Sequence, residues 1–138
     1  MFRKMTTNLM VEDVNRTVDF YSKVLGFEFV MGVLKDSQDI IVSWQNDKDL
    51  NYAMMRSGDM DIMFQSEASM KEDIPGFNGG QIGGSLTLYI EVDDIEDLYS
   101  NIREDVNVVK ELECTFYGMQ EFYIKDCNGY VLGFAESL

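Results

Sequence analysis

The stretch VEDVNRTVDFYSKVLGFEF, residues 11–29, contains the end of one strand, a helix and the start of the next strand. Asp13 stands where a helix N-cap is expected, since its side chain can accept a hydrogen bond from a free backbone N–H. Apolar residues follow at helical spacing, at Val14, Val18, Tyr21, Val24 and Leu25. Gly26 is a typical helix stop. The stretch therefore predicts strand, helix and strand in close succession.

The rest of the first half predicts further strands. Residues 4–11 and 27–34 read as strands, and 40–44 reads as a strand or an extended loop. Residues 52–56 and 61–65 flank Ser57-Gly58-Asp59, a good hairpin turn. From residue 66 to 84 the periodicity disappears, and the stretch contains Pro75 and five glycines. It is interpreted as a linker between modules or as a mobile lid over a site.

The second half restarts the same order. Residues 86–92 alternate, Asp94 is positioned to cap a helix, and an apolar stripe follows at Ile95, Leu98, Tyr99 and Ile102. Three strands are predicted at 106–110, 118–125 and 130–136, with the Asn128-Gly129 turn between the last two. The halves also match in letters, VEDV at 11–14 against VDDI at 92–95, and DFYS at 19–22 against DLYS at 97–100. This repeat predicts two strand–helix–strand–strand–strand modules in one structure.

The opening VEDVNRTVDFYSKVLGFEF and the closing FYIKDCNGYVLGFAE (residues 122–136) resemble the two ends of the vicinal-oxygen-chelate superfamily, which includes glyoxalase I, extradiol dioxygenases and bleomycin-resistance proteins. The resemblance covers nearly the whole chain. It implies an α+β fold in which two βαβββ modules form a curved mixed sheet around a cavity, with the helices outside. On this reading residues 1–138 are one domain, with modules at about 1–66 and 85–138 and the linker or lid at about 67–84. The superfamily is often homodimeric, which implies a homodimer here, and the modules could pair within one chain or between two.

The metal enzymes of that superfamily place histidine or glutamate at four strand positions facing the cavity. Aligned through the matching motifs, those positions are Thr6, Met63, Thr87 and Gly133. None is a good ligand for a divalent metal, and shifts of one or two residues offer only Asn8 and Gln65. The chain has no histidine at all. We therefore predict no metal, no cofactor and no family-type catalytic residue.

Composition limits the partners. The chain has 25 acidic and 11 basic residues, a net charge of −14, which disfavours nucleic acid and anionic membrane surfaces. The acidity has two interpretations, solubility or attraction for a cationic ligand. Cys114 and Cys127 form no CxxC pair and read as reduced thiols. No apolar run is long enough to span a membrane, and no signal-peptide pattern opens the chain, so a cytoplasmic location is predicted.

Strand alternation predicts which residues face the cavity. In residues 86–92 the even-numbered positions are apolar and should pack under the helices, whereas Thr87, Tyr89 and Glu91 share the other face. The same alternation in the other strands, together with one aromatic outside them, completes the candidate ligand-binding set: Thr6, Asn8, Met10, Trp44, Asp61, Met63, Gln65, Thr87, Tyr89, Glu91 and Gly133. This wall contains no cation. The alternative is a solvated sheet face with no ligand, and for Trp44 and other aromatics core packing or dimer contact.

Three functions remain open. The first is a metal-free binding protein that sequesters a small organic compound, cationic or aromatic, as the bleomycin-resistance branch does. The second is an isomerase, lyase or oxygenase with an atypical site, using Glu91, Asp61, Tyr89 or a cysteine for acid–base chemistry. The third is an interaction module whose cavity is filled by Met63, Met10 and Tyr89. Other enzyme signatures such as GxSxG and the P-loop are missing, so binding ranks first.

Overall fold

The structure, a computed structural model, describes residues 1–77 and 80–138. The chain divides into two compact units, Met1–Gly80 and Gln81–Leu138, and each is described by itself. The segment 67–84, interpreted from the sequence as a linker or lid, includes Asn78 and Gly79, which lie outside the described residues. Within the described part of the chain, no helix is both long and apolar enough to cross a membrane.

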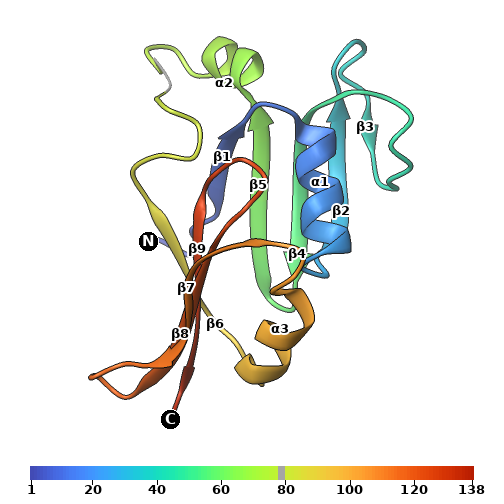
Figure 1. The fold of residues 1–138 in the computed structure, drawn as a ribbon. Helices are drawn as coiled ribbons and strands as arrows, with labels where there is room; N and C mark the ends of the chain where they lie inside the picture. The colour runs from blue at the N-terminus through green and yellow to red at the C-terminus, as the bar shows by residue number, and fades with distance from the viewer. Residues whose placement is uncertain (78–79) are drawn as a thin grey trace. The chain divides into compact units, whose positions relative to one another are not determined.

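The first unit is a mixed five-stranded sheet with two helices (Figure 1). Its elements in chain order are β1 (Thr7–Val11), α1 (Val14–Lys23), β2 (Glu28–Leu34), β3 (Ile40–Ile41), β4 (Leu50–Ser57), β5 (Met60–Ser66) and α2 (Glu67–Asp73). The strand order is β1-β5-β4-β2-β3, with β1 parallel to β5 and the other neighbours antiparallel.

The second unit is a mixed four-stranded sheet with one helix (Figure 1). Its elements are β6 (Thr87–Glu91), α3 (Ile95–Ile102), β7 (Asn107–Cys114), β8 (Met119–Lys125) and β9 (Val131–Ser137). The order β6-β9-β8-β7 again pairs the first strand in parallel with the last. This matches β1-β5-β4-β2 in the first unit, so the predicted α+β fold of two βαβββ modules is confirmed.

Helix α1 begins and ends as the sequence predicts. The Asp13 side chain accepts a 3.0 Å hydrogen bond from the backbone N–H of Arg16, and Gly26 adopts a φ of +76° just beyond the helix. The apolar stripe of α1 is buried against the sheet, where the rings of Tyr21 and Phe64, both fully buried, lie 4.7 Å apart. Helix α1 therefore covers one face of the first sheet.

The structure adds detail to two stretches that the sequence left open. Residues 66–84 are not without regular structure, because α2 spans Glu67–Asp73, with the Ser66 side chain accepting from the N–H of Ser69. Only Met70 of this helix is buried, so it has no apolar stripe for periodicity to detect. Residues 40–44, which read as a strand or an extended loop, form the two-residue strand β3 and then a loop that contains Trp44.

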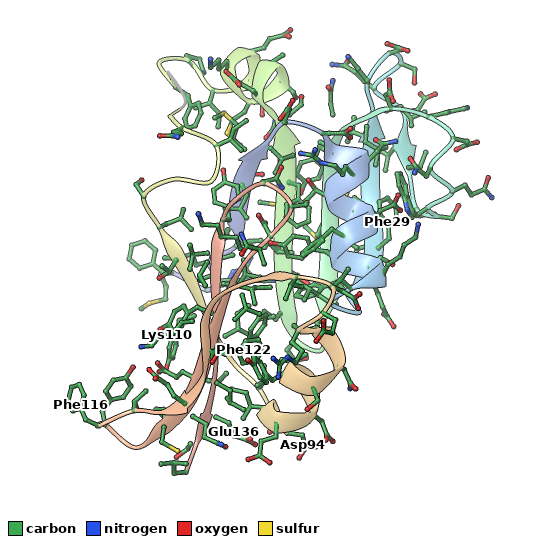
Figure 2. The ribbon with its side chains drawn as sticks, viewed as in Figure 1. Phe29, Asp94, Lys110, Phe116, Phe122 and Glu136 are labelled. Carbon is green, nitrogen blue, oxygen red and sulfur yellow. The ribbon has the colours of Figure 1, made fainter. Side chains whose placement is uncertain are left out.

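Helix α3 is capped from a distance. Asp94 occupies the N-cap position but has a φ of +56°, and its side chain makes no capping hydrogen bond. The carboxylate of Glu136, on β9, instead accepts from the backbone N–H groups of Asp94 and Ile95, both at 3.0 Å, and Figure 2 shows it close to the start of the helix. The prediction that Asp94 itself caps the helix is wrong, because Glu136, far along the chain on β9, supplies the acceptor.

Candidate functional site

The face of the first sheet opposite α1 has three rows of side chains that cross neighbouring strands. The pairing of β4 with β5 places Arg56 opposite Asp61, Met54 opposite Met63, and Tyr52 opposite Gln65. These pairs define a charged row, a thioether row and a polar row. The polar row borders a cavity.

The charged row is internally neutralised. The Asp61 side chain is 3% exposed and accepts hydrogen bonds from Arg56, at 2.6 Å from Nε and 3.2 Å from Nη2, and from Lys4. The hydrogen bonds from Arg56 and then Lys4 hold the pKa of Asp61 well below its usual range. The prediction of a wall without cations is therefore wrong here. Arg56 reaches Asp61 from the adjacent strand and Lys4 lies before β1, so alternation within each strand could not reveal either contact.

The thioether row continues onto a third strand. Met63 of β5, Met54 of β4 and Met31 of β2 are neighbours through the strand register, and all three are half-buried. Methionine side chains are flexible and polarizable and adapt to irregular contacts. This row separates the neutralised charges from the polar row.

The polar row contains a directed chain of side-chain hydrogen bonds. Asn8 Nδ2 donates to Gln65 Oε1 at 2.9 Å, and Gln65 Nε2 donates to Ser69 Oγ of α2 at 3.0 Å. Gln65 is only 6% exposed. The Asn8 Oδ1 atom is buried as well, and it has no hydrogen-bond donor among the described residues. The sequence placed both Asn8 and Gln65 on the ligand wall, and the structure brings them into direct contact.

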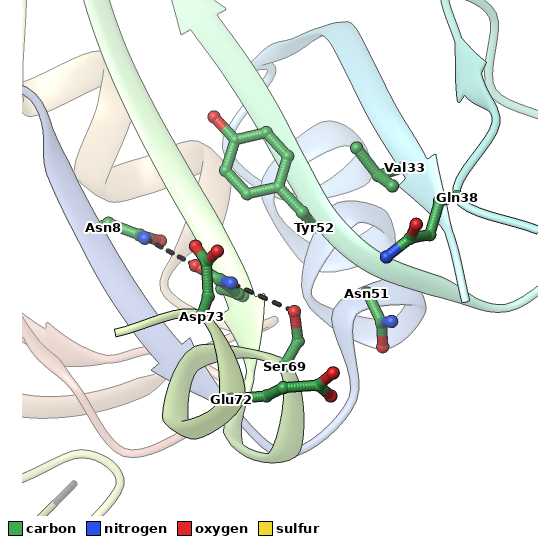
Figure 3. A pocket seen from close by; sticks show the side chains of 9 residues that line it. Asn8, Val33, Gln38, Asn51, Tyr52, Ser69, Glu72 and Asp73 are labelled. Atoms are coloured by element: carbon green, nitrogen blue, oxygen red, sulfur yellow. Dashed lines mark hydrogen bonds between the residues drawn. The ribbon is translucent and has the colours of Figure 1, made fainter. Parts of the chain in front are cut away.

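A cavity of about 520 Å³ lies over this row (Figure 3). Its lining residues come from β1, β2, β4, β5, α2 and the connecting turns, and none of them is a lysine or arginine: Asn8, Val33, Gln38, Asn51, Tyr52, Gln65, Ser69, Glu72 and Asp73. Burial, and secondly the nearby Asp61 carboxylate, raises the pKa of Tyr52, so its hydroxyl keeps its proton at neutral pH. The cavity thus offers amides, hydroxyls, one ring and two carboxylates.

Sequence reasoning missed most of this lining. Ser69, Glu72 and Asp73 lie on α2, which the sequence analysis took for irregular chain. Tyr52 was not in the candidate set, although its position opposite Gln65 follows once the register of the β4–β5 hairpin is known. Ser66 followed by acidic Glu67 was the one available signal for α2, as a helix N-cap with a negative first turn.

The residues that the resemblance places at the family-type metal positions do not fit a divalent metal. Thr6, Met63, Thr87 and Gly133 offer two hydroxyls, a thioether and no side chain. Of the possible substitutes, the amides of Asn8 and Gln65 are bonded to each other. Across residues 1–77 and 80–138, no three His, Cys, Asp or Glu side chains come together as a ligand set.

Two other candidates, Trp44 and Met10, are not among the residues that line the cavity. Trp44 donates from Nε1 to Asp19 at 3.1 Å, and its ring stacks on Phe29 at 5.7 Å. Met10 is buried, with 6% of its surface exposed. Trp44 therefore contributes to packing within the first unit.

The second unit carries a different cluster on the face opposite α3. Tyr117 Oη donates to Glu121 Oε1 at 2.6 Å, and Tyr89 Oη donates to Glu121 Oε2. Glu121 is fully buried, whereas Tyr89 is 49% exposed. Thr87 and Glu91 share the exposed side of β6 with Tyr89. Tyr89 thus meets a carboxylate that the sequence analysis did not place on the wall.

In this cluster the pKa of Glu121 is lowered and the pKa values of Tyr117 and Tyr89 are raised. Burial alone would raise the pKa of Glu121, but hydrogen bonds from Tyr117 and Tyr89 bring it below its usual value. The hydrogen bond to Glu121, together with burial, raises the pKa of Tyr117 to about 12, and the same causes raise that of Tyr89. At neutral pH the carboxylate is ionised and both hydroxyls keep their protons. Neither partner is poised for proton transfer there.

This linkage predicts a pH-dependent stability. Because the folded protein holds the tyrosine protons more tightly than the unfolded chain, whose tyrosines titrate near a pKa of about 10, the stabilisation is complete below pH about 10 and lost as pH rises towards 12. We expect the free energy of urea unfolding to fall less steeply between pH 9 and 11.5 in Glu121→Gln than in the unsubstituted protein. Identical slopes in the two proteins would contradict the assignment.

The space above Gly133 is filled by the protein itself. Gly133 lies opposite Tyr89 on one side and Tyr123 on the other. A Cβ at residue 133 would lie 2.4 Å from Cε2 of Tyr123, which is far inside van der Waals contact. Gly133, which the sequence analysis placed in the candidate ligand-binding set, therefore accommodates the Tyr123 ring.

Comparison with known proteins identifies the family. Residues 5–134 match the model of the Glyoxalase/Bleomycin resistance protein/Dioxygenase superfamily. The chain belongs to this superfamily. No curated protein matches the sequence.

Several solved structures share this fold over nearly the whole chain. A protein of unknown function from Agrobacterium tumefaciens has a TM-score of 0.72 at 22% identity, covering 100% of this chain and 96% of that chain. TioX from Micromonospora has a TM-score of 0.70 at 16% identity, with 99% and 100% covered. A glyoxalase-related enzyme from Fulvimarina pelagi has a TM-score of 0.72 at 13% identity, with 99% and 89% covered. At these identities the similarity establishes the fold and leaves activity to the site.

Proposed function

We propose that this superfamily member is a metal-free small-molecule-binding protein, and that it sequesters a cationic organic compound in the cavity over Asn8 and Gln65. The observation that carries this proposal is the lining of the cavity: two carboxylates, several amides and hydroxyls, and no lysine or arginine. A volume of about 520 Å³ is within the range of small-ligand sites.

The charge of the site supports a cation. Glu72 and Asp73 of α2 border the cavity, and Figure 3 shows both carboxylates beside it. Asp61, whose charge is neutralised by Lys4 and Arg56, is not among the residues that line the cavity. The net charge of −14 favours the approach of a cation to the whole molecule.

The Tyr52 ring supports an aromatic or cationic group in the ligand. It lines the cavity and is only half-buried, so a face or edge is available for stacking or for a cation–π contact. Val33 provides an apolar neighbour on β2. The interaction-module hypothesis, in which the cavity is filled, has less support because this cavity is open in the first unit.

The enzyme hypothesis also has less support. Asp61, one of its acid–base candidates, is neutralised by Arg56 and Lys4, and the Tyr89–Glu121 pair has both pKa values displaced from neutrality. Glu91 is exposed and Cys114 is an exposed free cysteine. Catalysis by these groups would need a substrate-induced change in their surroundings.

A matched set of ligands tests the proposal. Benzylammonium, benzyl alcohol and benzoate share a ring and differ in charge, and calorimetric titration at low and high salt compares them directly. We expect measurable binding of the cation, weaker binding in high salt, and none for benzoate. Glu72→Gln/Asp73→Asn should weaken binding of the cation roughly two- to thirtyfold, since partly exposed charge pairs contribute about 0.2–1 kcal/mol each.

The matched control is Asp105→Asn/Glu111→Gln, which removes two exposed carboxylates of the second unit and leaves the cavity intact. It should bind benzylammonium as the unsubstituted protein does. Equal binding of benzoate, or equal losses in both double variants, would contradict the site. Native mass spectrometry of the same samples tests the homodimer, which stays a prediction, as does the cytoplasmic location.

A further inference from the structure

The turn between β8 and β9 contains the dipeptide Asn128-Gly129, which has a reactivity of its own. In such a dipeptide the glycine backbone nitrogen can attack the side-chain carbonyl carbon of the asparagine, since no glycine side chain hinders the approach. A C–N bond forms, and the side-chain nitrogen leaves as ammonia with the proton of the attacking N–H, which closes a succinimide ring. Water then opens the ring to aspartate or isoaspartate.

Hydrogen bonds and burial restrain both reacting groups in the folded turn. The Gly129 N–H, which must lose its proton, donates to the backbone oxygen of Asp126 at 3.1 Å. The Asp126 carboxylate accepts from the N–H groups of Asn128, at 2.8 Å, and Tyr130, at 2.9 Å, which fixes the backbone around the glycine. Asn128 Oδ1, where negative charge develops as the ring closes, is shielded from water. Ring closure therefore requires the turn to open.

Gly83, in the segment before β6, lies directly against this turn. A Cβ added to Gly83 would lie 2.7 Å from the backbone oxygen of Asn128 and 3.0 Å from the carbonyl carbon of Gly129. The φ of Gly83, +87°, also favours glycine. Its backbone N–H donates to the hydroxyl of Tyr130, which is 4% exposed. The Gly83 backbone therefore covers the reactive dipeptide within the second unit.

We propose that Asn128 is a site of spontaneous deamidation, and that release of Gly83 from the β8–β9 turn sets its rate. This inference is independent of the proposed function, because the site lies in the second unit and needs no ligand. A reaction that proceeds only from an open form has a rate proportional to the population of that form. Loosening Gly83 should accelerate deamidation, whereas destabilising the unit elsewhere should not.

Either product changes the turn irreversibly, since the ammonia is lost. Aspartate would place a second carboxylate beside that of Asp126, which is 6% exposed. Isoaspartate would add a methylene to the backbone between the N–H groups of residues 128 and 130, which both donate to Asp126.

Peptide mapping by mass spectrometry measures the reaction directly. Trypsin cleavage after Lys125 gives a peptide of residues 126–138, in which Asn128 is the only asparagine or glutamine, so an amide-to-acid mass gain reports this site alone. The protein is incubated at mildly alkaline pH, folded or in urea. We expect the folded protein to react at least about tenfold more slowly than the unfolded chain. Equal rates would overturn the inference.

Gly83→Ala should accelerate deamidation of the folded protein about five- to hundredfold, because overpacking against the turn raises the population of the open form. Gly133→Ala is the matched control, since it crowds the Tyr123 ring instead of the turn, and it should leave the rate within about twofold. An unchanged rate in Gly83→Ala would overturn the inference. Equal acceleration in both variants would do so too, because the reaction would then occur in globally unfolded chains.

Tyr130→Phe keeps the inference testable if Gly83→Ala does not fold. It removes the hydroxyl that accepts from the Gly83 N–H and retains the ring. We expect deamidation to accelerate about fivefold, with faster hydrogen exchange of the Gly129 amide. A folded Tyr130→Phe variant that deamidates at the original rate would contradict control by Gly83.

Discussion

Replacing Phe64 by alanine is expected to lower the free energy of unfolding by about 3–5 kcal/mol, the range for deleting a large buried ring. Phe64 is fully buried on β5, and its ring lies 4.7 Å from that of Tyr21 on α1. Removing it leaves a cavity beneath the helix that covers the sheet. Urea unfolding at neutral pH measures the loss.

Phe116→Ala is the matched control because it deletes the same atoms from a ring that is 100% exposed. Figure 2 shows Phe116 at the tip of the hairpin between β7 and β8. We expect a change within about 0.5 kcal/mol for this substitution. A loss below about 1 kcal/mol for Phe64→Ala would mean that α1 repacks freely, contrary to the tight core described above.

Replacing Gly133 by alanine is expected to destabilise the protein by about 1–3 kcal/mol, as overpacking of a filled site does. The new Cβ would lie 2.4 Å from Cε2 of Tyr123 and 2.9 Å from both Cδ2 and Cζ, so the ring must move. Displacement of the Tyr123 ring would also disturb the surroundings of Glu121, which is buried and lies two residues before Tyr123 on β8. The measurement is again the free energy of unfolding in urea.

Two further variants distinguish steric conflict from a general effect of losing glycine. Gly80→Ala should cost little, since a Cβ there meets no atom within 4 Å. The double variant Gly133→Ala/Tyr123→Ala should lose less than the sum of the two single losses, with a coupling of about 0.5–3 kcal/mol. Additive losses would show that Gly133 serves another purpose than room for the Tyr123 ring.

Local features of the fold could be predicted because their causes are local. Asp13 bonds an N–H three residues away, Gly26 bends the chain where it stands, and the buried face of β5, with Ile62 and Phe64, follows from a period of two. The repeat of VEDV as VDDI marks two modules, and the structure gives both the same strand order. Asn8 and Gln65 were found because both lie on the polar face of a predicted strand.

Contacts between strands and helices could not be predicted in the same way. The neutralisation of Asp61 by Lys4 and Arg56, and the cap that Glu136 supplies to α3, join residues that no short pattern relates. Helix α2 lacks an apolar stripe, so its contribution of Ser69, Glu72 and Asp73 to the cavity was invisible as well.

The sequence by itself determined the family and the two modules, because these depend on which residue types stand at which spacing. Only the tertiary structure decided which polar groups already have partners within the protein. Asp61 and Asn8 both read as cavity-facing polar residues, yet one is engaged by two cations and the other retains an unsatisfied carbonyl oxygen. That difference arises from hydrogen bonds between neighbouring strands and a helix, whose register and position depend on packing of the whole unit.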